Sequence, residues 1–232
     1  MWIFYLERLL ICLKIFYEDN HLLVVEKDYN MLCQSDNTGD INLLDELKKY
    51  VKNKYNKPNN VYIGLVHRLD RPVGGIMVFA RTSKAASRLS KLIREHNMKK
   101  IYLLVCHGKF NEISGQYNDK ILKQDDFKSI ISDKGKESLL YYRVLDYNKD
   151  KDESLVMVDL VSGRHHQIRV EFSYHGHPIV GDNLYGKCER VPISLYCYRI
   201  EFIHPTLKNK MDFCNIPNYS SFCDFNIKEL LK

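Results

Sequence analysis

The densest group of side chains that could do chemistry lies in residues 64–80, which read GLVHRLDRPVGGIMVFA. One carboxylate, Asp70, stands there between Arg68 and Arg71, and Pro72 and a glycine pair follow it. Glycine and proline allow a tight loop whose backbone can approach a ligand closely. Neighbouring guanidinium groups would keep the carboxylate ionised and could also hold phosphates. The pattern suits a nucleophile that acts on a polyanion, while an Arg–Asp pair that only fixes a loop remains an alternative.

A second cluster lies in residues 162–186, which contain SGRHHQIRVEFSYHGHPIVGDNLYG. Its adjacent histidines and its His-x-His pair suggest a metal site, but zinc sites usually add Cys, Asp or Glu at recognisable spacing, and no HExxH is present. Arg169 follows His165 by four residues, so both could lie on one helix face that points at a ligand. A polar helix face in solvent is the alternative.

A third element, Lys99-Lys100-Ile101-Tyr102, is expected to join a basic helix to a strand. A tyrosine beside two lysines could stack on a nucleobase, although a core tyrosine is the commoner case. The chain has no GxGxxG after a strand, no GxxxxGK[ST] loop and no GxSxG elbow. Nothing therefore indicates a nucleotide cofactor.

The elements that must position these residues follow from apolar spacing. We expect a helix after Asn42, a second helix capped by Ser83 and a third over residues 164–175, which Gly176 and Pro178 end. Apolar and β-branched runs predict strands over residues 21–27, 76–80, 101–106, 139–146, 154–161 and 195–203. Strands without regular βαβ alternation favour an α+β fold with a mixed, mainly antiparallel sheet.

Length and composition set the class of protein. The 232 residues are 45% apolar and 12% aromatic, which suits one globular domain. A net charge of +6 favours an anionic partner such as nucleic acid. Seven cysteines without a CxxC motif indicate free thiols in a reducing, cytoplasmic compartment. Residues 1–14 are too short and too charged to span a membrane and lack a signal-peptide pattern, so we expect an extra packing element or a terminal extension.

Together these motifs resemble the RluA-type RNA pseudouridine synthases. His67-Arg68-Leu69-Asp70 is similar to the loop that carries the family's catalytic aspartate, and Lys100-Ile101-Tyr102 to its K-x-Y element. Residues 163–169 (GRHHQIR) resemble its GRxHQ[IL]R element, and residues 176–182 (GHPIVGD) the segment that follows. Residues 17–27 and 201–205 match its opening and late strands. The elements occur in the family's order over residues 16–217.

The resemblance implies a pseudouridine synthase fold, in which helices flank the sheet and an active-site cleft crosses it. It implies an isomerase that converts uridine in RNA to pseudouridine without metal or cofactor. Residues 16–232 would form the catalytic domain, after an extension over residues 1–15 and without a separate N-terminal RNA-binding domain. We expect a monomer that acts on ribosomal or transfer RNA and does not bind membranes.

Residue roles follow from the same resemblance. Asp70 would be the nucleophile that helps to cleave the N-glycosidic bond, with attack on the ribose and attack on the base both open. Tyr102 would stack on the uracil and could assist proton removal, and Arg169 would pair with Asp70 and hold it ionised and oriented. Arg68 would help to displace the base from its stack, as base-modifying enzymes require. The other residues expected to bind substrate or support the cleft are His67, Lys100, Arg164 and Gln167.

The sequence departs from the family at three places. It has Val73-Gly74-Gly75 where Thr-Ser-Gly is usual, and Lys27-Asp28 where Lys-Pro is usual. His166 fills the family's histidine position, while His165 occupies a variable one. These changes leave the catalytic set intact and concern substrate choice and RNA affinity.

Two other functions remain open from the sequence. One is a catalytically silent RNA-binding protein of the same fold. The other is a metal-dependent phosphoesterase that would use His67, Asp70, His165 and His177, and a chelator would inhibit it.

Overall fold

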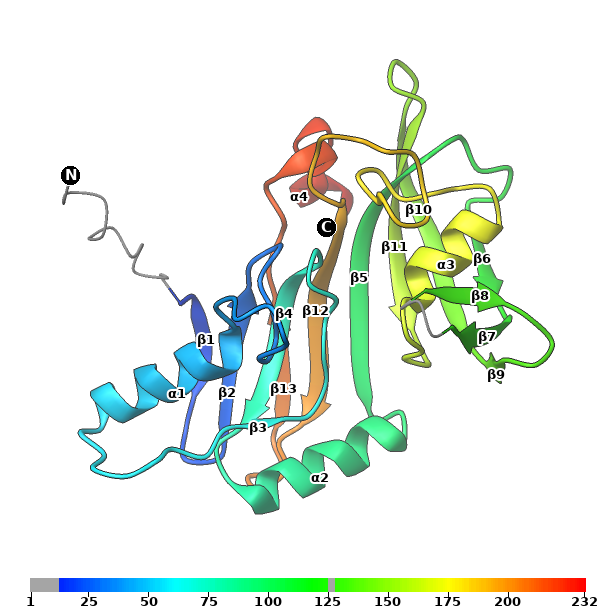
Figure 1. Cartoon of the computed structure of the whole chain (residues 1–232). Coiled ribbons are helices and arrows are strands. Elements are labelled where there is room, and N and C mark those ends of the chain that lie inside the picture. The colour runs from blue at the N-terminus through cyan, green and yellow to red at the C-terminus, as the bar shows by residue number, and fades with distance from the viewer. Residues whose placement is uncertain (1–12, 125–127) are drawn as a thin grey trace, which may run out of the picture.

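The computed structural model describes residues 13–124 and 128–232, and most of the extension predicted over residues 1–15 lies outside them. One large sheet forms the centre of the molecule (Figure 1), with strand order β1-β2-β4-β12-β5-β11-β10-β6, while β3 pairs with β4 and β13 with β12. A second, small sheet has the order β8-β7-β9. The elements are β1 (Ile15–Glu18), β2 (Leu22–Lys27), α1 (Leu43–Lys54), β3 (Gly64–Leu65), β4 (Gly74–Ala80), α2 (Ser83–Arg94), β5 (Met98–His107), β6 (Ser114–Tyr117), β7 (Lys120–Lys123), β8 (Ser129–Ile131), β9 (Lys136–Glu137), β10 (Leu140–Asn148), β11 (Glu153–Leu160), α3 (Gln167–Tyr174), β12 (Leu195–Ile203), β13 (Lys210–Cys214), the 3₁₀ helix η1 (Ser220–Asp224) and α4 (Ile227–Leu230).

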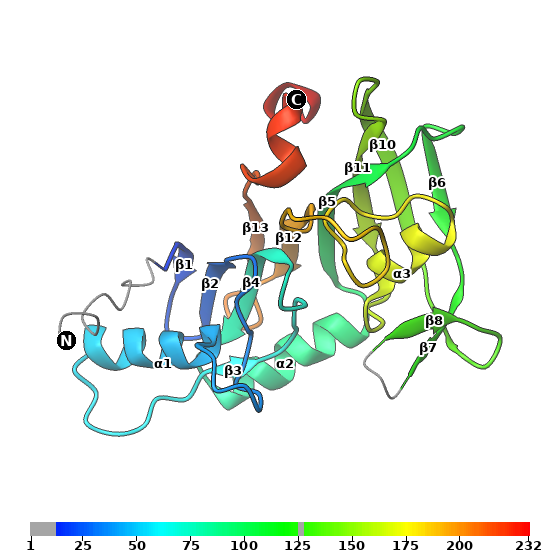
Figure 2. The same ribbon diagram turned by 45° about the horizontal axis from the view of Figure 1, so that its top comes forward.

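The prediction of an α+β fold with a mixed, mainly antiparallel sheet is confirmed. β12 runs parallel to β4 and antiparallel to β5, so it joins the two halves of the sheet. The close approach of β4 to β12 requires Gly75, because a Cβ there would lie 2.5 Å from the main-chain nitrogen of Cys197. In both Figure 1 and Figure 2, α1 lies beside the β1–β2 end of the sheet and α3 beside the β10–β6 end.

The two longest helices form where the apolar spacing predicts them, with one corrected boundary. Asn42 caps α1, since its side chain accepts a hydrogen bond from the main-chain nitrogen of Asp45, as expected. The cap of α2 is Thr82, whose hydroxyl accepts from the nitrogen of Ala85 at 3.1 Å, and not Ser83 as predicted. Ser83 is the first helical residue.

The third predicted helix is shorter than the expected span over residues 164–175. It begins at Gln167, because His166 adopts a left-handed backbone with φ 55° and interrupts the helix before that point. The prediction that His165 and Arg169 share a helix face is therefore wrong. The helix ends at Tyr174, and Gly176 follows with φ 86°.

The predicted strands are present with small shifts, and Leu195–Ile203 has the predicted bounds. Lys99–Tyr102 does not connect a helix to a strand as expected but lies within β5. The sequence did not indicate β1, β6 to β9 or β13, which are short or strongly polar. β4 is buried along its whole length, in keeping with its central place in the sheet. No helix in the described residues is both long and apolar enough to cross a membrane.

Candidate active site

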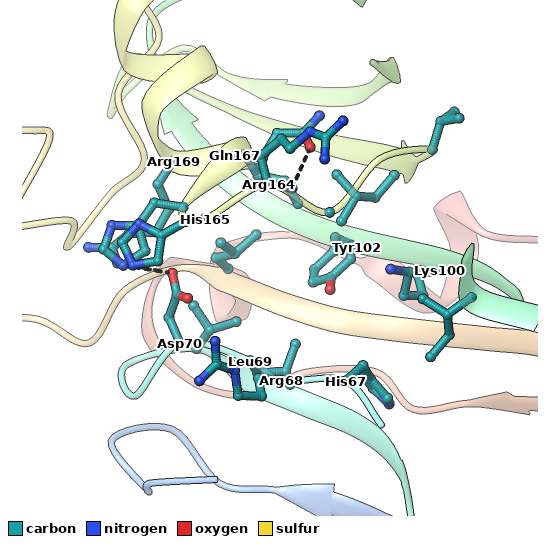
Figure 3. A pocket seen from close by; sticks show the side chains of 18 of the residues that line it. His67, Arg68, Leu69, Asp70, Lys100, Tyr102, Arg164, His165, Gln167 and Arg169 are labelled. Carbon is teal, nitrogen blue, oxygen red and sulfur yellow. Dashed lines mark hydrogen bonds and ion pairs between the residues drawn. The ribbon is translucent and has the colours of Figure 1, made fainter. Parts of the chain in front are cut away.

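A cavity of about 380 Å³ lies between the loop before β4 and the segment that leads into α3. Side chains of β5 line it between these two walls (Figure 3). All the residues that the sequence analysis assigned to the site line this cavity: His67, Arg68, Asp70, Lys100, Tyr102, Arg164, Gln167 and Arg169. Segments that lie far apart in the sequence thus meet at one place.

Asp70 sits in a tight turn at the wall formed by the loop. The main-chain nitrogen of Val73 donates to the carbonyl oxygen of Asp70 at 3.0 Å and closes the turn. Across the cavity, Nη1 of Arg169 donates to Oδ2 of Asp70 at 3.1 Å. The side chain of Asp70 is 29% exposed, so its carboxylate remains accessible from the cavity.

Arg169 is itself held by a second carboxylate, which the sequence analysis did not assign to the site. Its Nε and Nη2 donate to the two oxygens of Asp182, each at 2.8 Å. Both side chains are buried. Burial alone would lower the pKa of Arg169, but the ion pairs with Asp182 and Asp70 raise it, so the guanidinium stays charged. The bidentate pair fixes the orientation of the guanidinium group, whose Nη1 donates to Asp70.

Tyr102 presents a buried aromatic ring to the cavity from β5. Tyr102 faces Cys197, its partner across the strands on β12. Burial raises the pKa of Tyr102 well above its usual value of 10.0, and the contact with Cys197 adds to the shift. The phenol is therefore protonated at neutral pH, which suits stacking or proton donation and disfavours a role as an anionic base.

His67 and Lys27 hold the loop that carries Asp70 in place. Nε2 of His67 accepts a hydrogen bond from the main-chain nitrogen of Val78 at 3.0 Å, and burial lowers the pKa of His67 to about 3, so the ring is neutral. Lys27 is fully buried, and its Nζ donates to three main-chain oxygens, among them that of Arg71 at 3.0 Å. Burial lowers the pKa of Lys27 to about 8. Both residues anchor the loop that carries Asp70.

The four other predicted residues divide into two kinds. Arg68 is exposed and Lys100 is half-buried, and both basic side chains line the cavity. Burial lowers the pKa of Lys100, because it disfavours the charged form. Gln167 is buried, and its Oε1 accepts from the hydroxyl of Ser162 at 2.8 Å and from the nitrogen of Arg164 at 3.1 Å. Nε of Arg164 donates to a main-chain oxygen of β9 at 2.8 Å. Gln167 and Arg164 thus shape the wall through contacts with the protein itself.

The adjacent histidines contribute to the site in a way that the sequence did not indicate. Nε2 of His166 lies 3.5 Å from Oδ2 of Asp70, and its Nδ1 lies 2.8 Å from the hydroxyl of Tyr185. The ring of His165 stacks on that of His166 with centroids 3.8 Å apart. Burial lowers the pKa of both rings, to about 4 for His166.

The residues of the alternative metal site are not gathered around one point. His177 stacks on Phe110 with centroids 3.7 Å apart and does not line the cavity. Over residues 13–124 and 128–232, no three His, Cys, Asp or Glu side chains are arranged to hold a metal ion.

Comparison with known proteins agrees with this geometry. Residues 21–174 match the RNA pseudouridylate synthase family. An uncharacterized RNA pseudouridine synthase of Mycoplasma genitalium is 31% identical over 209 residues, which cover 87% of this chain and 65% of the relative. The ribosomal large subunit pseudouridine synthase C of Buchnera aphidicola (strain Bp) is 29% identical over 85% of this chain and 64% of its own length. This chain therefore spans just under two thirds of these relatives.

Solved structures share the fold. The human RNA pseudouridylate synthase domain containing 1 superposes with a TM-score of 0.73 at 24% identity, covering 90% of this chain and 85% of that one. The human RNA pseudouridylate synthase domain containing 4 gives the same TM-score at 22% identity, with 88% of each chain covered. With the sequence match over most of the sheet and over both walls of the cavity, the chain belongs to the RNA pseudouridylate synthase family.

Proposed function

We propose that this protein is an RNA pseudouridine synthase whose nucleophile is Asp70. The observation that carries the proposal is the carboxylate of Asp70, which faces a cavity of about 380 Å³ while Arg169 holds one of its oxygens at 3.1 Å. A volume of this size is within the range of small-ligand sites, roughly 300–1,000 Å³. It suits a single nucleotide turned out of an RNA strand.

The reaction needs only what the cavity supplies. The bond between N1 of uracil and C1′ of ribose breaks, the base rotates, and a bond forms between C5 and C1′. C5 then loses its proton, and N1 gains one. Asp70 assists the first bond cleavage as a nucleophile, and the bond that it forms to the nucleotide breaks again before the product leaves, so the carboxylate is regenerated. Tyr102 stacks on the detached base so that the base turns without leaving. No electron is gained or lost overall, so the isomerisation requires no redox cofactor.

RNA is the substrate that the charges support. Arg68 and Lys100 are basic side chains that line the cavity of Asp70, and the chain as a whole carries +6. Phosphate contacts from such residues give an affinity that falls as salt increases. Relatives named for the ribosomal large subunit favour ribosomal RNA, with transfer RNA as the second choice. We expect the enzyme to act as a monomer in the cytoplasm.

Tritium release from RNA labelled at C5 of uridine tests the proposal, because the reaction removes that hydrogen. Ribosomal and transfer RNA from cells that lack the protein serve as substrates, with the Asp70→Asn variant as a negative control and EDTA in a parallel reaction. We expect release with the wild-type protein, none with the variant, and no effect of the chelator.

Two outcomes would contradict the proposal. Salt-sensitive binding of every RNA tested without tritium release would favour the silent RNA-binding protein. Cleavage of phosphoesters that EDTA stops would favour the metal-dependent phosphoesterase.

A further inference from the structure

His166 belongs to a chain of hydrogen bonds that fixes where its ring proton lies. The main-chain nitrogen of Ser129 donates to the hydroxyl oxygen of Tyr185 at 2.7 Å, and that hydroxyl lies 2.8 Å from Nδ1 of His166. Burial raises the pKa of Tyr185, so the phenol keeps its proton. A phenol has one proton to donate. Its oxygen already accepts from Ser129, so in the arrangement that uses each group once the phenol donates its proton to Nδ1, which then acts as the acceptor.

In that arrangement the proton of a neutral His166 ring is on Nε2, the nitrogen that lies 3.5 Å from Oδ2 of Asp70. The ring remains neutral because burial lowers the pKa of His166 to about 4. Asp70 and Asp182 favour its charged form, while Arg169 and His165 oppose it. With burial outweighing the two carboxylates, the Nε2–H group is a neutral donor at the pH of a cell.

The orientation of the ring is fixed as well as its tautomer. His165 stacks on it with centroids 3.8 Å apart, and the hydroxyl of Ser129 lies 3.0 Å from Nδ1 of His165. That hydroxyl also donates to the carbonyl oxygen of His165 at 2.8 Å. Ser129 therefore supports both histidines, one through its backbone and Tyr185, the other through its side chain.

Both donors at Asp70 point to the same oxygen. Arg169 donates to Oδ2 at 3.1 Å, and Nε2 of His166 faces that oxygen too. Within the described residues, no hydrogen bond to Oδ1 is found. The distance from His166 is longer than a formed hydrogen bond, and catalytic contacts of this kind often shorten only when substrate is bound.

We infer that His166 is a second positioning residue for Asp70: its Nε2–H group and Arg169 together hold Oδ2, which leaves Oδ1 as the oxygen that attacks the nucleotide. This inference rests on the proposed function. A carboxylate held at one oxygen by two fixed donors cannot rotate freely, so its other oxygen keeps one direction into the cavity. Tyr185 acts one step further back, because it sets the tautomer of His166.

Three variants test the role of the donor. His166→Phe keeps a ring but removes both nitrogens, and we expect kcat to fall about ten- to a hundredfold with KM for RNA unchanged within about twofold. His166→Gln places an amide N–H near the position of Nε2, and we expect it to restore kcat to within about fivefold of the wild type. Tyr185→Phe should lower kcat about three- to tenfold in the wild-type background. It should have no further effect beside His166→Gln, because glutamine has no tautomer to set.

A direct reading of the tautomer keeps the inference testable if a variant fails to fold. In the wild-type protein with ¹⁵N-labelled histidine, nuclear magnetic resonance should show His166 neutral and protonated at Nε2 at pH 7, and still neutral at pH 5.5. Assignment follows from the signal that disappears in His166→Gln, with Tyr185→Phe as a second marker.

Several results would overturn the inference. Protonation at Nδ1 in the wild type would remove the donor. A rise in KM with unchanged kcat in His166→Phe would make His166 an RNA contact instead, and equal losses in the Phe and Gln variants would exclude a donor role. If the wild type releases no tritium from any RNA, the proposed function fails while the tautomer measurement still stands by itself.

Discussion

Two carboxylate–histidine pairs in this molecule consist of the same residue types and differ in what surrounds them. Asp70 and His166 meet at the cavity, with Nε2 of the histidine 3.5 Å from Oδ2. Asp19 and His204 meet between the turn after β1 and the end of β12, with Nε2 of the histidine 3.0 Å from Oδ2. Only the first pair lines the cavity.

The pair at Asp19 has no hydrogen-bonding capacity to spare. Oδ1 accepts from the main-chain nitrogens of His21 and Leu22 at 2.7 and 2.6 Å, and Oδ2 faces the hydroxyl of Tyr17 and His204, both at 3.0 Å. Despite burial, which alone would raise it, these contacts hold the pKa of Asp19 below its usual value. Among residues 13–124 and 128–232, Oδ1 of Asp70 has no such partner. Free hydrogen-bonding positions beside a cavity, and not residue type, distinguish the carboxylate that we propose to react from the structural one.

The largest effect should come from removing the reactive carboxylate. Asp70→Asn is nearly isosteric but no longer a nucleophile, so we expect kcat to fall on the order of 10⁴-fold or more. The free energy of unfolding should change by less than about 1 kcal/mol, because Arg169 keeps its pair with Asp182. Tritium release and urea unfolding measure the two quantities. Undiminished turnover would show that Asp70 is a structural acid like Asp19.

Asp182→Asn should lower both kcat and the free energy of unfolding, because Asp182 is buried and holds Arg169. It weakens a buried bidentate pair with Arg169, which should lower the free energy of unfolding by about 3 kcal/mol. Loss of the fixed guanidinium should also lower kcat about a hundredfold. The same two assays apply. A stability loss without any change in kcat would mean that Arg169 does not need Asp182 to orient Asp70.

Asp19→Asn should lower stability and leave kcat unchanged, which is the reverse of the effect expected for Asp70→Asn. The amide oxygen can still accept from His21 and Leu22, but the amide nitrogen cannot accept from Tyr17 or His204. We expect the free energy of unfolding to fall by about 1–3 kcal/mol and kcat at 25 °C to remain unchanged. A lowered kcat in folded Asp19→Asn protein would show that the Asp19–His204 pair also contributes to activity and is not only structural.

Glu171 is a buried carboxylate, and the effect of its substitution on stability should depend on pH. Its Oε1 lies 2.6 Å from the hydroxyl of Ser138, which also lies 2.8 Å from the carbonyl oxygen of Asp119. Ser138 has one proton for two acceptors. A protonated Glu171 can donate to the hydroxyl oxygen of Ser138 while that hydroxyl donates to the carbonyl oxygen of Asp119. Burial raises the pKa of Glu171 to about 7 from its usual 4.5.

The sign of the pH effect follows from this shift. The folded protein binds a proton that the unfolded chain releases between pH 4.5 and about 7. The stability that Glu171 contributes is therefore complete below pH 4.5 and is lost as the pH rises through 7. Glu171→Gln mimics the protonated form, so it should be more stable than the wild type by about 1–3 kcal/mol at pH 8 and equal to it near pH 4.5. Urea unfolding at the two pH values measures this, and an equal difference at both would exclude titration of Glu171.

The sequence predicted the features that depend on local pattern. The apolar spacing after Asn42 gave α1, and continuous β-branched runs gave the central strands. The cap of α2 was displaced by one residue, because Thr82 and Ser83 are both good caps and only the backbone decides between them. Short polar strands such as β9 carry no apolar alternation, so they could not be distinguished from loops.

The motifs predicted the cavity's residues and the pair between Arg169 and Asp70, but not the contacts that hold this pair in place. Asp182 lay in a recognised segment, yet its pairing with Arg169 depends on the turn that follows α3. The role of His166 depends on a left-handed backbone and on Tyr185, which lies 19 residues further along. Tertiary packing sets both, and no spacing rule in the sequence encodes it.

The position of β12 between β4 and β5 has a consequence for the order in which the protein is made. Asp70 and Tyr102 leave the ribosome early, but the strand that joins their two halves of the sheet ends only at Ile203. Until then the two halves of the sheet that carry the proposed nucleophile and its guanidinium partner are not joined, and each half has an open edge. Catalytic competence should therefore arise late and abruptly during synthesis, and the half-formed chain should depend on chaperones to protect its unpaired strands.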